Sequence, residues 1–575
     1  MTRKTKILGK RRVVHETELQ SRKPWVLLTG LFALAGLLIA WMGRGVSLIG
    51  DEWAWIFASV DPRFEDLFQN YNGHLMATTY ALYDLLTRIS LAHLWIYRAP
   101  ALILHLVVAY LVFCLARRRL DSFTALVPTA VVLFLGTGAD AYLSGLNYNE
   151  LAATAACLGA LLLLERQTPQ ADAAASGLLV LGIASFSNAV AFAAGVVVEL
   201  LVRSDRSLRR LWIPLVPFAL YAGWRLRWGS SSDVAPGSPT DVIRQAFRAA
   251  TGAFAGLAGV QLENFTLKAH LPWVAAVAQI VLVLLIVGTC TVLTMRHHRV
   301  SPRLANLVVT GAILWLLIGL GRSSQDVYAS RYVYEGAIIA LLILVELAAV
   351  FAVQTSTVRR ILAFSIAVAI VLNIGWMAVW ARHLRKASDL TRAQLAALEI
   401  AGSEAAPSFR PASGFLLGHV TAGEYFAAVR EFGDSPAYSP AELRRAPEKE
   451  REAADRVLAR ALALRLTAAG LRFTAADVQV EHLASGRLTH RGNCLLVSPQ
   501  PDQAMSVDLV VRSSKGVTLR PAPRATLHIQ VRRFAEQYES VPISVHRTGR
   551  LLTPLGGVGD PWHLRVVAYA PATVC

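Results

Sequence analysis

Two adjacent carboxylates, Asp51 and Glu52, lie between apolar residues just after the first long hydrophobic segment of the chain. Carboxylates at or inside a membrane are costly unless they are paired or functional, so these two are the first candidates for chemistry. A positioned carboxylate can take a proton from a hydroxyl group. The alternative is that the pair stabilises the N-terminus of a helix, where negative charge is favourable.

A second group of polar residues begins after two glycines, in Gly136-Thr137-Gly138-Ala139-Asp140-Ala141-Tyr142, and extends to Asn147. It supplies an acid, a phenol and amides, and we take Tyr142 and Asn147 as candidate substrate contacts. Asp140 is a candidate functional acid, and the alternative is a solvated turn residue beside glycines. His74, which follows Gly73, is a further candidate for substrate contact, although a histidine in that position is also typical of a turn.

Arg331 and Tyr332 stand at the expected edge of a late hydrophobic segment, after a polar loop that contains Arg322. A guanidinium can hold a phosphate through two hydrogen bonds, so these three residues are candidates for phosphate binding. The alternative is an arginine that extends to the membrane interface beside a tyrosine of the aromatic belt. Arg225 and Arg227 are weaker candidates for the same task.

The elements that must position these residues are membrane helices. The 575 residues are 54% hydrophobic with a mean hydropathy of +0.45, which is far more apolar than an ordinary soluble domain. Apolar runs of about 20 residues, enough to span a bilayer, recur from Trp25 to Trp380. We predict about eleven spanning helices. They are expected near residues 25–42, 96–116, 123–138, 148–164, 174–186, 188–202, 211–224, 272–295, 303–320, 333–352 and 360–380.

The distribution of basic residues predicts the orientation. Residues 1–24 are basic and precede the first apolar run, so the positive-inside rule predicts that they lie in the cytoplasm. No small-x-small cleavage pattern follows that run, which favours an uncleaved anchor. Further basic clusters fall at every second break, for example at Arg117-Arg118-Arg119 and Arg359-Arg360. Residues 174–202 are also compatible with a re-entrant hairpin, which changes the helix count by two and leaves the orientation of both ends unchanged.

The net charge of +18 is explained by the basic residues expected in the cytoplasmic loops, so we expect no nucleic-acid partner.

The first outer loop, residues 43–92, is predicted to be structured. Asp61-Pro62 is typical of a helix start, and Phe64, Leu67, Phe68 and Tyr71 share one helical face, which predicts a helix lying flat on the membrane surface. Residues 70–74 interrupt this pattern, and a second amphipathic stretch follows over residues 75–89.

Residues 381–575 have soluble composition and, after an odd number of spans, are expected outside the cytoplasm. A helical pattern covers residues 438–471, and strands are predicted over 506–511, 525–531, 541–545 and 563–569. We therefore expect a polytopic helical membrane protein with a mixed α/β, β-rich soluble domain. Cys494 and Cys575 belong to this domain, and we predict a disulfide between them, which requires an oxidising compartment; the alternative is two unpaired thiols.

The acidic pair at the start of the first outer loop, the membrane-parallel helices expected in that loop, and about eleven spans followed by a soluble domain together resemble the GT-C superfamily of polytopic glycosyltransferases. This superfamily includes protein O-mannosyltransferases and the aminoarabinose transferases of lipid A. The resemblance covers the membrane part loosely, to about residue 380, and its only short motif is the acidic pair. The soluble domain matches no branch, so neither sugar nor acceptor is implied.

The resemblance implies inverting transfer of a sugar from a polyprenyl-phosphate donor to a hydroxyl group of a glycan, lipid or protein acceptor. Asp51 is then the expected base, and Glu52 is a less suitable base or orients Asp51 or the acceptor. Asp140 becomes the candidate ligand of a divalent metal, Mg²⁺ or Mn²⁺, as in some relatives. Arg331, Tyr332 and Arg322 take the donor phosphate.

Two other classes fit a polytopic chain. A transporter or flippase would carry acids and broken helices near the middle of the bilayer, where the sequence offers mainly loop acids. A non-enzymatic scaffold would use the outer module to bind glycan or protein, but it would not need an acid-bearing structured first loop. The composition is compatible with the plasma membrane of a bacterium, with membrane lipids as the surroundings.

Overall fold

The computed structural model divides into two compact units, which are described separately. The helical unit contains the described residues up to Val46, Asp61–Leu86 and Trp95–Arg385, and the C-terminal unit contains Ser47–Val60, Thr87–Leu94 and Lys386–Cys575. The described residues are 23–203, 208–229, 238–262, 272–295, 300–321, 327–350, 356–412, 416–462, 466–468, 478–492, 494–500, 503–512, 516–551, 553 and 559–575.

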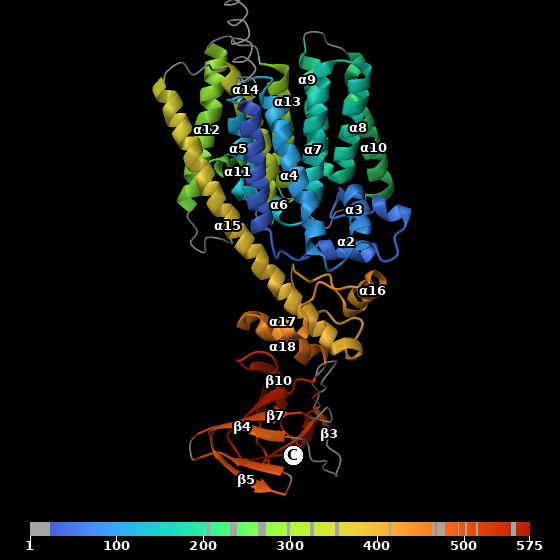
Figure 1. Cartoon of the computed structure of the whole chain (residues 1–575), viewed down its shortest axis with the longest axis vertical. Coiled ribbons are helices and arrows are strands. Elements are labelled where there is room, and N and C mark those ends of the chain that lie inside the picture. Colours follow the sequence, from blue (N-terminus) through green and yellow to red (C-terminus); the bar gives the residue numbers. More distant parts are fainter. Residues whose placement is uncertain are drawn as a thin grey trace, which may run out of the picture. The chain divides into compact units, whose positions relative to one another are not determined.

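The helical unit begins with the helix Lys23–Met42. Its other elements, labelled in part in Figure 1, are η1 (Phe64–Phe68), β1 (Asn70–Tyr71), β2 (His74–Leu75), α3 (Ala77–Thr87), α4 (Leu94–Ala116), α5 (Leu126–Leu133), η2 (Gly136–Gly138), α6 (Asp140–Leu143), α7 (Tyr148–Leu163), η3 (Leu164–Arg166), α8 (Pro169–Ser185), η4 (Ser187–Ala189), α9 (Val190–Val202), η5 (Leu208–Leu211), α10 (Trp212–Trp228), α11 (Pro239–Leu257), α12 (Pro272–Met295), α13 (Pro302–Gly321), α14 (Ser330–Val350) and α15 (Ser356–Ala401).

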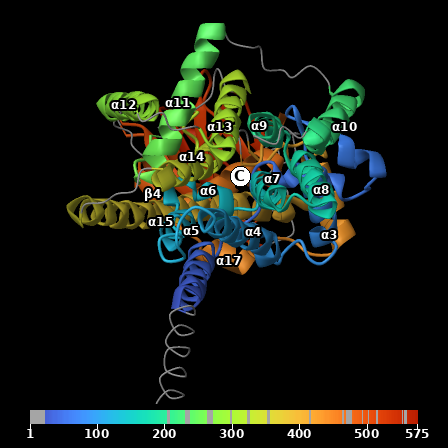
Figure 2. The ribbon, with the colours of Figure 1, turned by 90° about the horizontal axis from the view of Figure 1, so that it is seen from above.

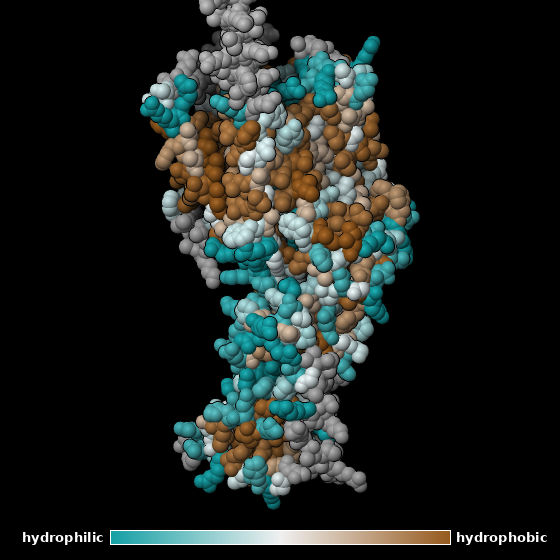
Figure 3. All heavy atoms as spheres, viewed as in Figure 1, coloured by the Kyte–Doolittle hydropathy of each residue, from teal (hydrophilic) through white to brown (hydrophobic). Residues whose placement is uncertain are grey.

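Six helices of the described chain are long and apolar enough to cross a membrane: Lys23–Met42, α4, α12, α13, α14 and α15. Large apolar side chains on them face outward, such as Ile103 on α4, Leu284 on α12 and Phe364 on α15, which are 58%, 64% and 71% exposed. Hydrophobic side chains also gather over the helices of this unit on the face seen in Figure 3. Such surfaces are stable in lipid and unfavourable in water, so the chain is a membrane protein.

The remaining predicted spans are shorter helices. α7, α8, α9 and α10 contain 16, 17, 13 and 17 residues, and the helix predicted over 123–138 ends at Leu133 after eight. At about 1.5 Å per residue these helices fall short of a hydrocarbon core about 30 Å thick. The count of eleven spans is therefore not confirmed. The predicted break at residues 186–188 is present as the short segment η4 between α8 and α9.

The sequence analysis predicts no helix between residues 224 and 272, so it missed α11 (Pro239–Leu257). Ser238 caps its N-terminus by accepting the backbone N–H of Asp241 at 3.2 Å, and proline follows as the first helical residue. Its small residues pack against α13 and α14; a Cβ added at Gly256 would lie 2.5 Å from the Val333 side chain. Charged residues on its other face keep its mean hydropathy low, and this concealed the helix from a search for apolar runs.

Close packing and buried ion pairs hold the helices together. In Figures 1 and 2, α7 lies beside α8 and α9 beside α13. Arg303 of α13 lies 3.3 Å from Glu199 of α9 and 3.5 Å from Glu165 of η3. Arg210 donates two hydrogen bonds, at 2.6 and 2.8 Å, to the carboxylate of Asp172 on α8. These pairs neutralise charges that would be costly to bury alone.

The first outer loop differs from the prediction. The expected helix over residues 64–71 is only the short 3-10 segment η1, and Arg63 precedes it in place of Asp61. A two-stranded hairpin follows, in which Asn70 pairs with Leu75 and Tyr71 with His74. Asn72 and Gly73 have φ angles of +51° and +86°, which are typical of an Asn-Gly hairpin turn. The turn chemistry therefore overrides the helical pattern, and the second stretch forms α3 as predicted.

The C-terminal unit contains α2 (Glu52–Ala58), the end of α15, η6 (Gly402–Glu404), α16 (Ala422–Phe432), α17 (Pro440–Arg445) and α18 (Glu448–Ala461). α15 is a single helix of 46 residues, so the predicted helix end at residue 380 is wrong. Apolar residues become fewer there, but strong helix formers continue. Parts of the first outer loop also belong to this unit: the Gly50 N–H donates to the Leu416 carbonyl at 3.0 Å, and the Leu91 N–H donates to Asp434 at 2.7 Å.

The β-rich module predicted for the end of the chain is confirmed. Its five-stranded sheet has the order β10 (Glu539–Val545), β9 (Leu527–Arg532), β12 (Trp562–Ala568), β7 (Met505–Val511) and β4 (Val478–Ser485). Its six-stranded sheet has the order β3 (Leu466–Ala468), β11 (Gly549–Leu551), β8 (Val517–Pro521), β13 (Ala572–Val574), β6 (Cys494–Ser498) and β5 (Arg487–Arg491). All pairings between the described strands are antiparallel, and alternate residues of β12 are buried, as expected for a sandwich.

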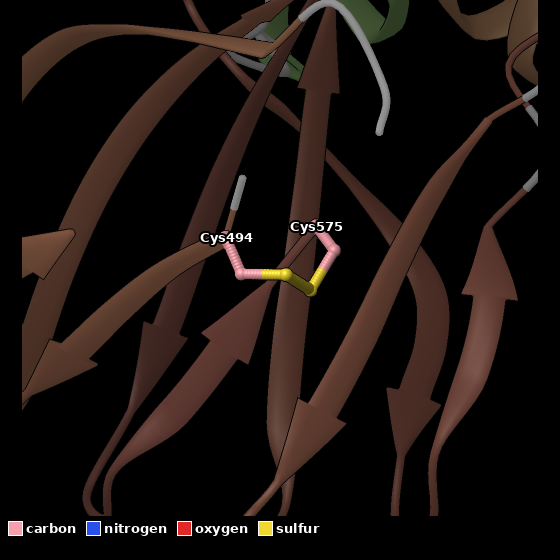
Figure 4. Close-up of a disulfide and its surroundings, with 2 residues drawn as sticks. All are labelled: Cys494 and Cys575. Atoms are coloured by element: carbon pink, nitrogen blue, oxygen red, sulfur yellow. A yellow bond between two sulfur atoms is a disulfide. The ribbon is translucent and has the colours of Figure 1, made fainter. Parts of the chain in front are cut away.

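Two features secure this module. Cys494, which opens β6, forms a disulfide with Cys575, which follows β13, and their Cα atoms are 4.3 Å apart (Figure 4). The predicted pairing is therefore confirmed. The buried carboxylate of Asp455 on α18 accepts the backbone N–H groups of Arg533, Phe534 and Ala535 at 2.7 to 3.0 Å. This contact fixes α18 to the turn that follows β9.

Candidate functional site

The loop between α5 and α7 brings the predicted polar residues against α14. A Cβ at Gly136 would lie 1.6 Å from the carbonyl oxygen of Asn373 on α15, and one at Gly138 would lie 2.9 Å from the Cβ of Tyr334. The Thr137 N–H donates to the Asn373 side chain at 3.0 Å. Only glycine permits so close an approach of the backbone, so these two residues set the position of α6 and of Asp140 at its start.

Asp140 and Asn147, which were predicted from the sequence as separate candidates, lie in contact. The Asn147 amide donates to the backbone carbonyl and to the carboxylate of Asp140, both at 3.3 Å. The Asp140 N–H donates to the Ser330 hydroxyl at 3.2 Å, which ties this loop to the first residue of α14. Asp140 is half-buried and Asn147 is buried.

Arg331 joins the same group. It is the second residue of α14, is half-buried, and interacts electrostatically with Asp140 and Glu150. Its guanidinium also donates to the Tyr332 hydroxyl at 3.4 Å. The structure thus brings together the predicted metal ligand, one predicted substrate contact and two predicted phosphate contacts. Arg322 lies outside the described residues.

Glu335 was missed in the sequence analysis. It stands one helical turn after Arg331, is 1% exposed, interacts with Glu150 and accepts a hydrogen bond from the Asn188 side chain. Within the described residues its Oε1 atom has no hydrogen-bond partner. The signal was available, because a carboxylate inside an apolar run, four residues after an arginine, shares a helix face with that arginine.

We call Asp140, Asn147, Glu150, Asn188, Arg331 and Glu335 the polar cluster. They come from α6, the start of α7, η4 and α14. His74 lies against the same short segment η4: its ring stacks on Phe186 with centroids 4.2 Å apart, and the neighbouring Leu75 N–H donates to the Ser187 hydroxyl at 3.0 Å. His74, a candidate substrate contact, is therefore a strand residue of the β1–β2 hairpin, and its contact with substrate stays a prediction.

Tyr142 packs inside the helical unit. It is 1% exposed, its ring stacks on His105 with centroids 4.0 Å apart, and its hydroxyl donates to the Leu135 carbonyl at 3.2 Å. These contacts give Tyr142 a packing role in the helical unit. Its predicted contact with substrate stays a prediction.

The described residues offer limited support for a metal site. Within them, no three His, Cys, Asp or Glu side chains gather as metal ligands. The carboxylate of Asp140 already accepts the Asn147 amide and interacts with Arg331. Mg²⁺ is often held by one or two carboxylates together with substrate phosphates, but this set of protein ligands does not by itself form such a site. No step proposed below involves a metal.

Asp51 and Glu52 lie in the C-terminal unit, where their surroundings differ. Glu52 is fully buried and accepts the Ile49 N–H at 3.0 Å. Asp51 is the N-cap of α2, yet it makes no side-chain capping bond within the described chain. Its side chain is 24% exposed, and its Oδ1 atom lies 4.0 Å from Nε2 of His419. Nothing in the sequence pointed to His419.

The support of Asp51 comes from the segment that follows α15. The Gly50 N–H binds the Leu416 carbonyl, and the Trp53 ring meets the ring of Tyr425 on α16 edge to face, with centroids 5.7 Å apart. The Tyr425 hydroxyl in turn donates to Glu399 at 2.7 Å. The turn that carries the acidic pair is therefore held in a defined position within its own unit.

Comparisons with known proteins give no family for the chain: no protein-family model matches it, and no curated protein matches it significantly.

Proposed function

We propose that the protein is a membrane glycosyltransferase of the GT-C type that moves a sugar from a polyprenyl-phosphate donor to a hydroxyl acceptor. The observation that carries this proposal is the contrast between the two adjacent carboxylates. Glu52 is buried and bound to the backbone, whereas Asp51 is accessible and is not engaged in capping α2. Asp51 is therefore the carboxylate available to act as a base.

In the proposed reaction Asp51 takes the proton of the acceptor hydroxyl. The hydroxyl oxygen attacks the anomeric carbon of the donor sugar, the bond from that carbon to the phosphate oxygen breaks, and polyprenyl phosphate leaves with the bonding electrons. One direct displacement inverts the configuration at the anomeric carbon. The 4.0 Å separation between Asp51 and His419 suits a histidine that orients the carboxylate or receives the proton from it through one water molecule.

Arg331 is the proposed ligand of the donor phosphate. Its guanidinium has five N–H donors in a planar fork, so it can contact Tyr332 and the neighbouring acids and still bind a phosphate. A cation at that place stabilises the negative charge that develops on the leaving phosphate. Tyr332 supports Arg331, with the guanidinium carbon 5.0 Å from the ring centroid.

The proposal includes a location. We propose about eleven spans, with the shorter helices α5 and α7 to α10 completing the bundle, a cytoplasmic N-terminus and an external C-terminal unit. The disulfide between Cys494 and Cys575 supports an oxidising compartment for that unit. A bacterial plasma membrane is the proposed site, with the lipid-linked sugar as donor and an extracytoplasmic glycan, lipid or protein as acceptor.

The test is transfer of radiolabelled sugar from a panel of polyprenyl-phosphate sugars to lipid, glycan and protein fractions by purified full-length protein. We expect transfer by the wild type and loss of about two to four orders of magnitude in rate for Asp51→Asn, as for removal of a general base. The matched control is Asp61→Asn, a carboxylate in the same loop with an 84% exposed side chain. An Asp51→Asn variant with full activity would exclude Asp51 as the base.

One observation favours a second class, a transporter or flippase: Glu335 is a buried carboxylate inside a spanning helix. It is, however, the sixth residue of α14, only about 8 Å along the helix from its first residue, and not near the middle of a bilayer. The test is movement of the polyprenyl-phosphate sugar across the membrane of proteoliposomes that contain the protein. Movement of the donor without its consumption would favour transport over sugar transfer.

A further inference from the structure

The mechanism above uses Asp51 and Arg331 and leaves the rest of the polar cluster unused. Arg331 interacts electrostatically with Asp140 and Glu150, and Glu335 interacts with Glu150 and accepts a hydrogen bond from Asn188. Glu335 and Glu150 are 1% and 4% exposed, and Asn188 is 8% exposed. The proposed roles of Asp51 and Arg331 therefore do not explain why the Glu335 carboxylate is buried here.

The Glu335 end of the cluster offers a hydrogen-bond acceptor. Within the described residues, the buried Oε1 atom of Glu335 has no hydrogen-bond donor. A buried acceptor without a donor is unfavourable, and the cost is relieved when a ligand supplies O–H groups. A hydroxyl group therefore fits the Glu335 end of the cluster better than an apolar or an anionic group.

The spacing along α14 fits a ligand that carries both hydroxyl groups and a phosphate. Arg331 and Glu335 are four residues apart on one helix face, about 6 Å along the axis, which is comparable to the width of one sugar ring. A phosphate bound at Arg331 would place the attached ring toward Glu335. Asn188 of η4, which donates a hydrogen bond to Glu335, and Glu150 of α7, which interacts with Glu335 electrostatically, would flank the same ring.

We propose that Glu150, Glu335 and Asn188 form a subsite that binds the hydroxyl groups of the donor sugar while Arg331 binds its phosphate. This inference rests on the proposed use of a polyprenyl-phosphate sugar and adds the residues that select the sugar. A buried carboxylate oxygen that accepts a hydrogen bond from a sugar hydroxyl discriminates strongly against a sugar that lacks this hydroxyl. The oxygen is then left without a hydrogen-bond donor.

The test measures binding, so that it does not depend on turnover. Purified full-length protein is titrated with α-glycosyl phosphates of mannose, glucose, galactose and arabinose, and with inorganic phosphate, and binding is followed by the shift in the unfolding temperature. The variants are Glu335→Gln, Asn188→Ala and Arg331→Gln. The matched control is Glu346→Gln, a carboxylate of the same helix that pairs with Arg119 at 2.7 Å.

We expect the wild type to bind at least one glycosyl phosphate ten-fold or more tightly than inorganic phosphate. Glu335→Gln should weaken binding of that glycosyl phosphate about 10- to 100-fold and leave binding of inorganic phosphate unchanged. Arg331→Gln should weaken binding of both. Asn188→Ala should repeat the selective loss, which covers the case that Glu335→Gln does not fold. Glu346→Gln should bind as the wild type does.

Equal binding of glycosyl phosphates and inorganic phosphate overturns the subsite, and so does unchanged glycosyl phosphate binding in both Glu335→Gln and Asn188→Ala. These outcomes are separate from a failure of the proposed function. Selective binding without sugar transfer in the radiolabel assay would retain the subsite and reject the transferase. Transfer with unaltered binding in the variants would retain the transferase and reject the subsite.

Discussion

Asp51 and Glu52 are adjacent in the sequence, but their carboxylates have opposite surroundings. The Glu52 side chain is buried and holds the turn at Ile49, while Asp51 is accessible beside His419. From the sequence we could identify the pair and prefer Asp51, but we could not see that His419, from a segment far along the chain, completes its surroundings. A single sequence does not show which distant segments of the chain lie close together in space.

This contrast predicts different effects on stability. Glu52→Gln weakens a buried charge-assisted hydrogen bond, so we expect it to lower the free energy of unfolding by about 1–3 kcal/mol. Asp51→Asn should change the stability by less than about 0.5 kcal/mol, because the side chain is partly exposed and makes no cap bond. Thermal unfolding of both detergent-solubilised variants would measure this. Equal destabilisation by the two variants would contradict the assigned roles.

Glu481 on β4 predicts a pH dependence for the β-rich module. Burial acts to raise its pKa, but the hydrogen bond from His563, at 2.7 Å, and the charge of Arg532 hold the pKa below its ordinary value. The stability from this group is therefore present above about pH 4.3, the unfolded value, and is lost as the pH falls through the lower folded pKa.

We expect Glu481→Gln to flatten the fall of the module's unfolding temperature below about pH 4.3. The matched control is Glu424→Gln, which removes a capping carboxylate from α16, outside the β-sheets, where the shape of the module's transition should not change. Intrinsic tryptophan fluorescence reports the transition because Trp562 is fully buried in β12. An unchanged acid limb in Glu481→Gln would contradict the assignment.

At the scale of elements, long apolar helices and alternating strands were predictable, and short or amphipathic elements were not. Five of the six long spans and strands β7, β9, β10 and β12 lie close to their predicted ranges, whereas α15 continues to Ala401. α11 was missed because it buries small residues instead of large apolar ones, and the helix predicted at residues 64–71 was wrong because Asn72-Gly73 forms a hairpin turn. In each case packing or turn chemistry prevails over average hydropathy.

The contact between η2 and α15 predicts a strict requirement for glycine. A methyl group at Gly136 would overlap the backbone oxygen of Asn373, so Gly136→Ala must displace α15 or the Asp140 loop. We expect a loss of about 2–4 kcal/mol in stability or failure to accumulate in the membrane. Gly177→Ala on α8 is the matched control, because its Cβ would meet nothing within 4 Å. Normal expression and stability of Gly136→Ala would contradict the observed packing.

At the scale of the whole molecule, the disulfide and the charge pattern independently support the same proposed orientation. Cys494 and Cys575 close a loop of 81 residues, and a disulfide of that kind persists in an oxidising compartment. By the positive-inside rule, the basic clusters at Arg117–Arg119 and at Arg203, Arg209 and Arg210 are expected on the cytoplasmic side. The sequence supplied both arguments, and the structure adds the disulfide itself and surface positions at which the orientation can be measured.

The orientation can be tested by labelling single cysteines in intact cells. In a chain whose free cysteines Cys114, Cys157 and Cys290 are replaced by serine, Tyr569→Cys offers a thiol at a position that is 78% exposed in the β-rich module. Leu208→Cys is its counterpart beside a basic cluster, at a position 64% exposed. A membrane-impermeant maleimide should label Tyr569→Cys without permeabilisation and Leu208→Cys only after it. The reverse pattern would place the C-terminal unit in the cytoplasm, where the disulfide would be reduced and the proposed extracytoplasmic acceptor would be out of reach.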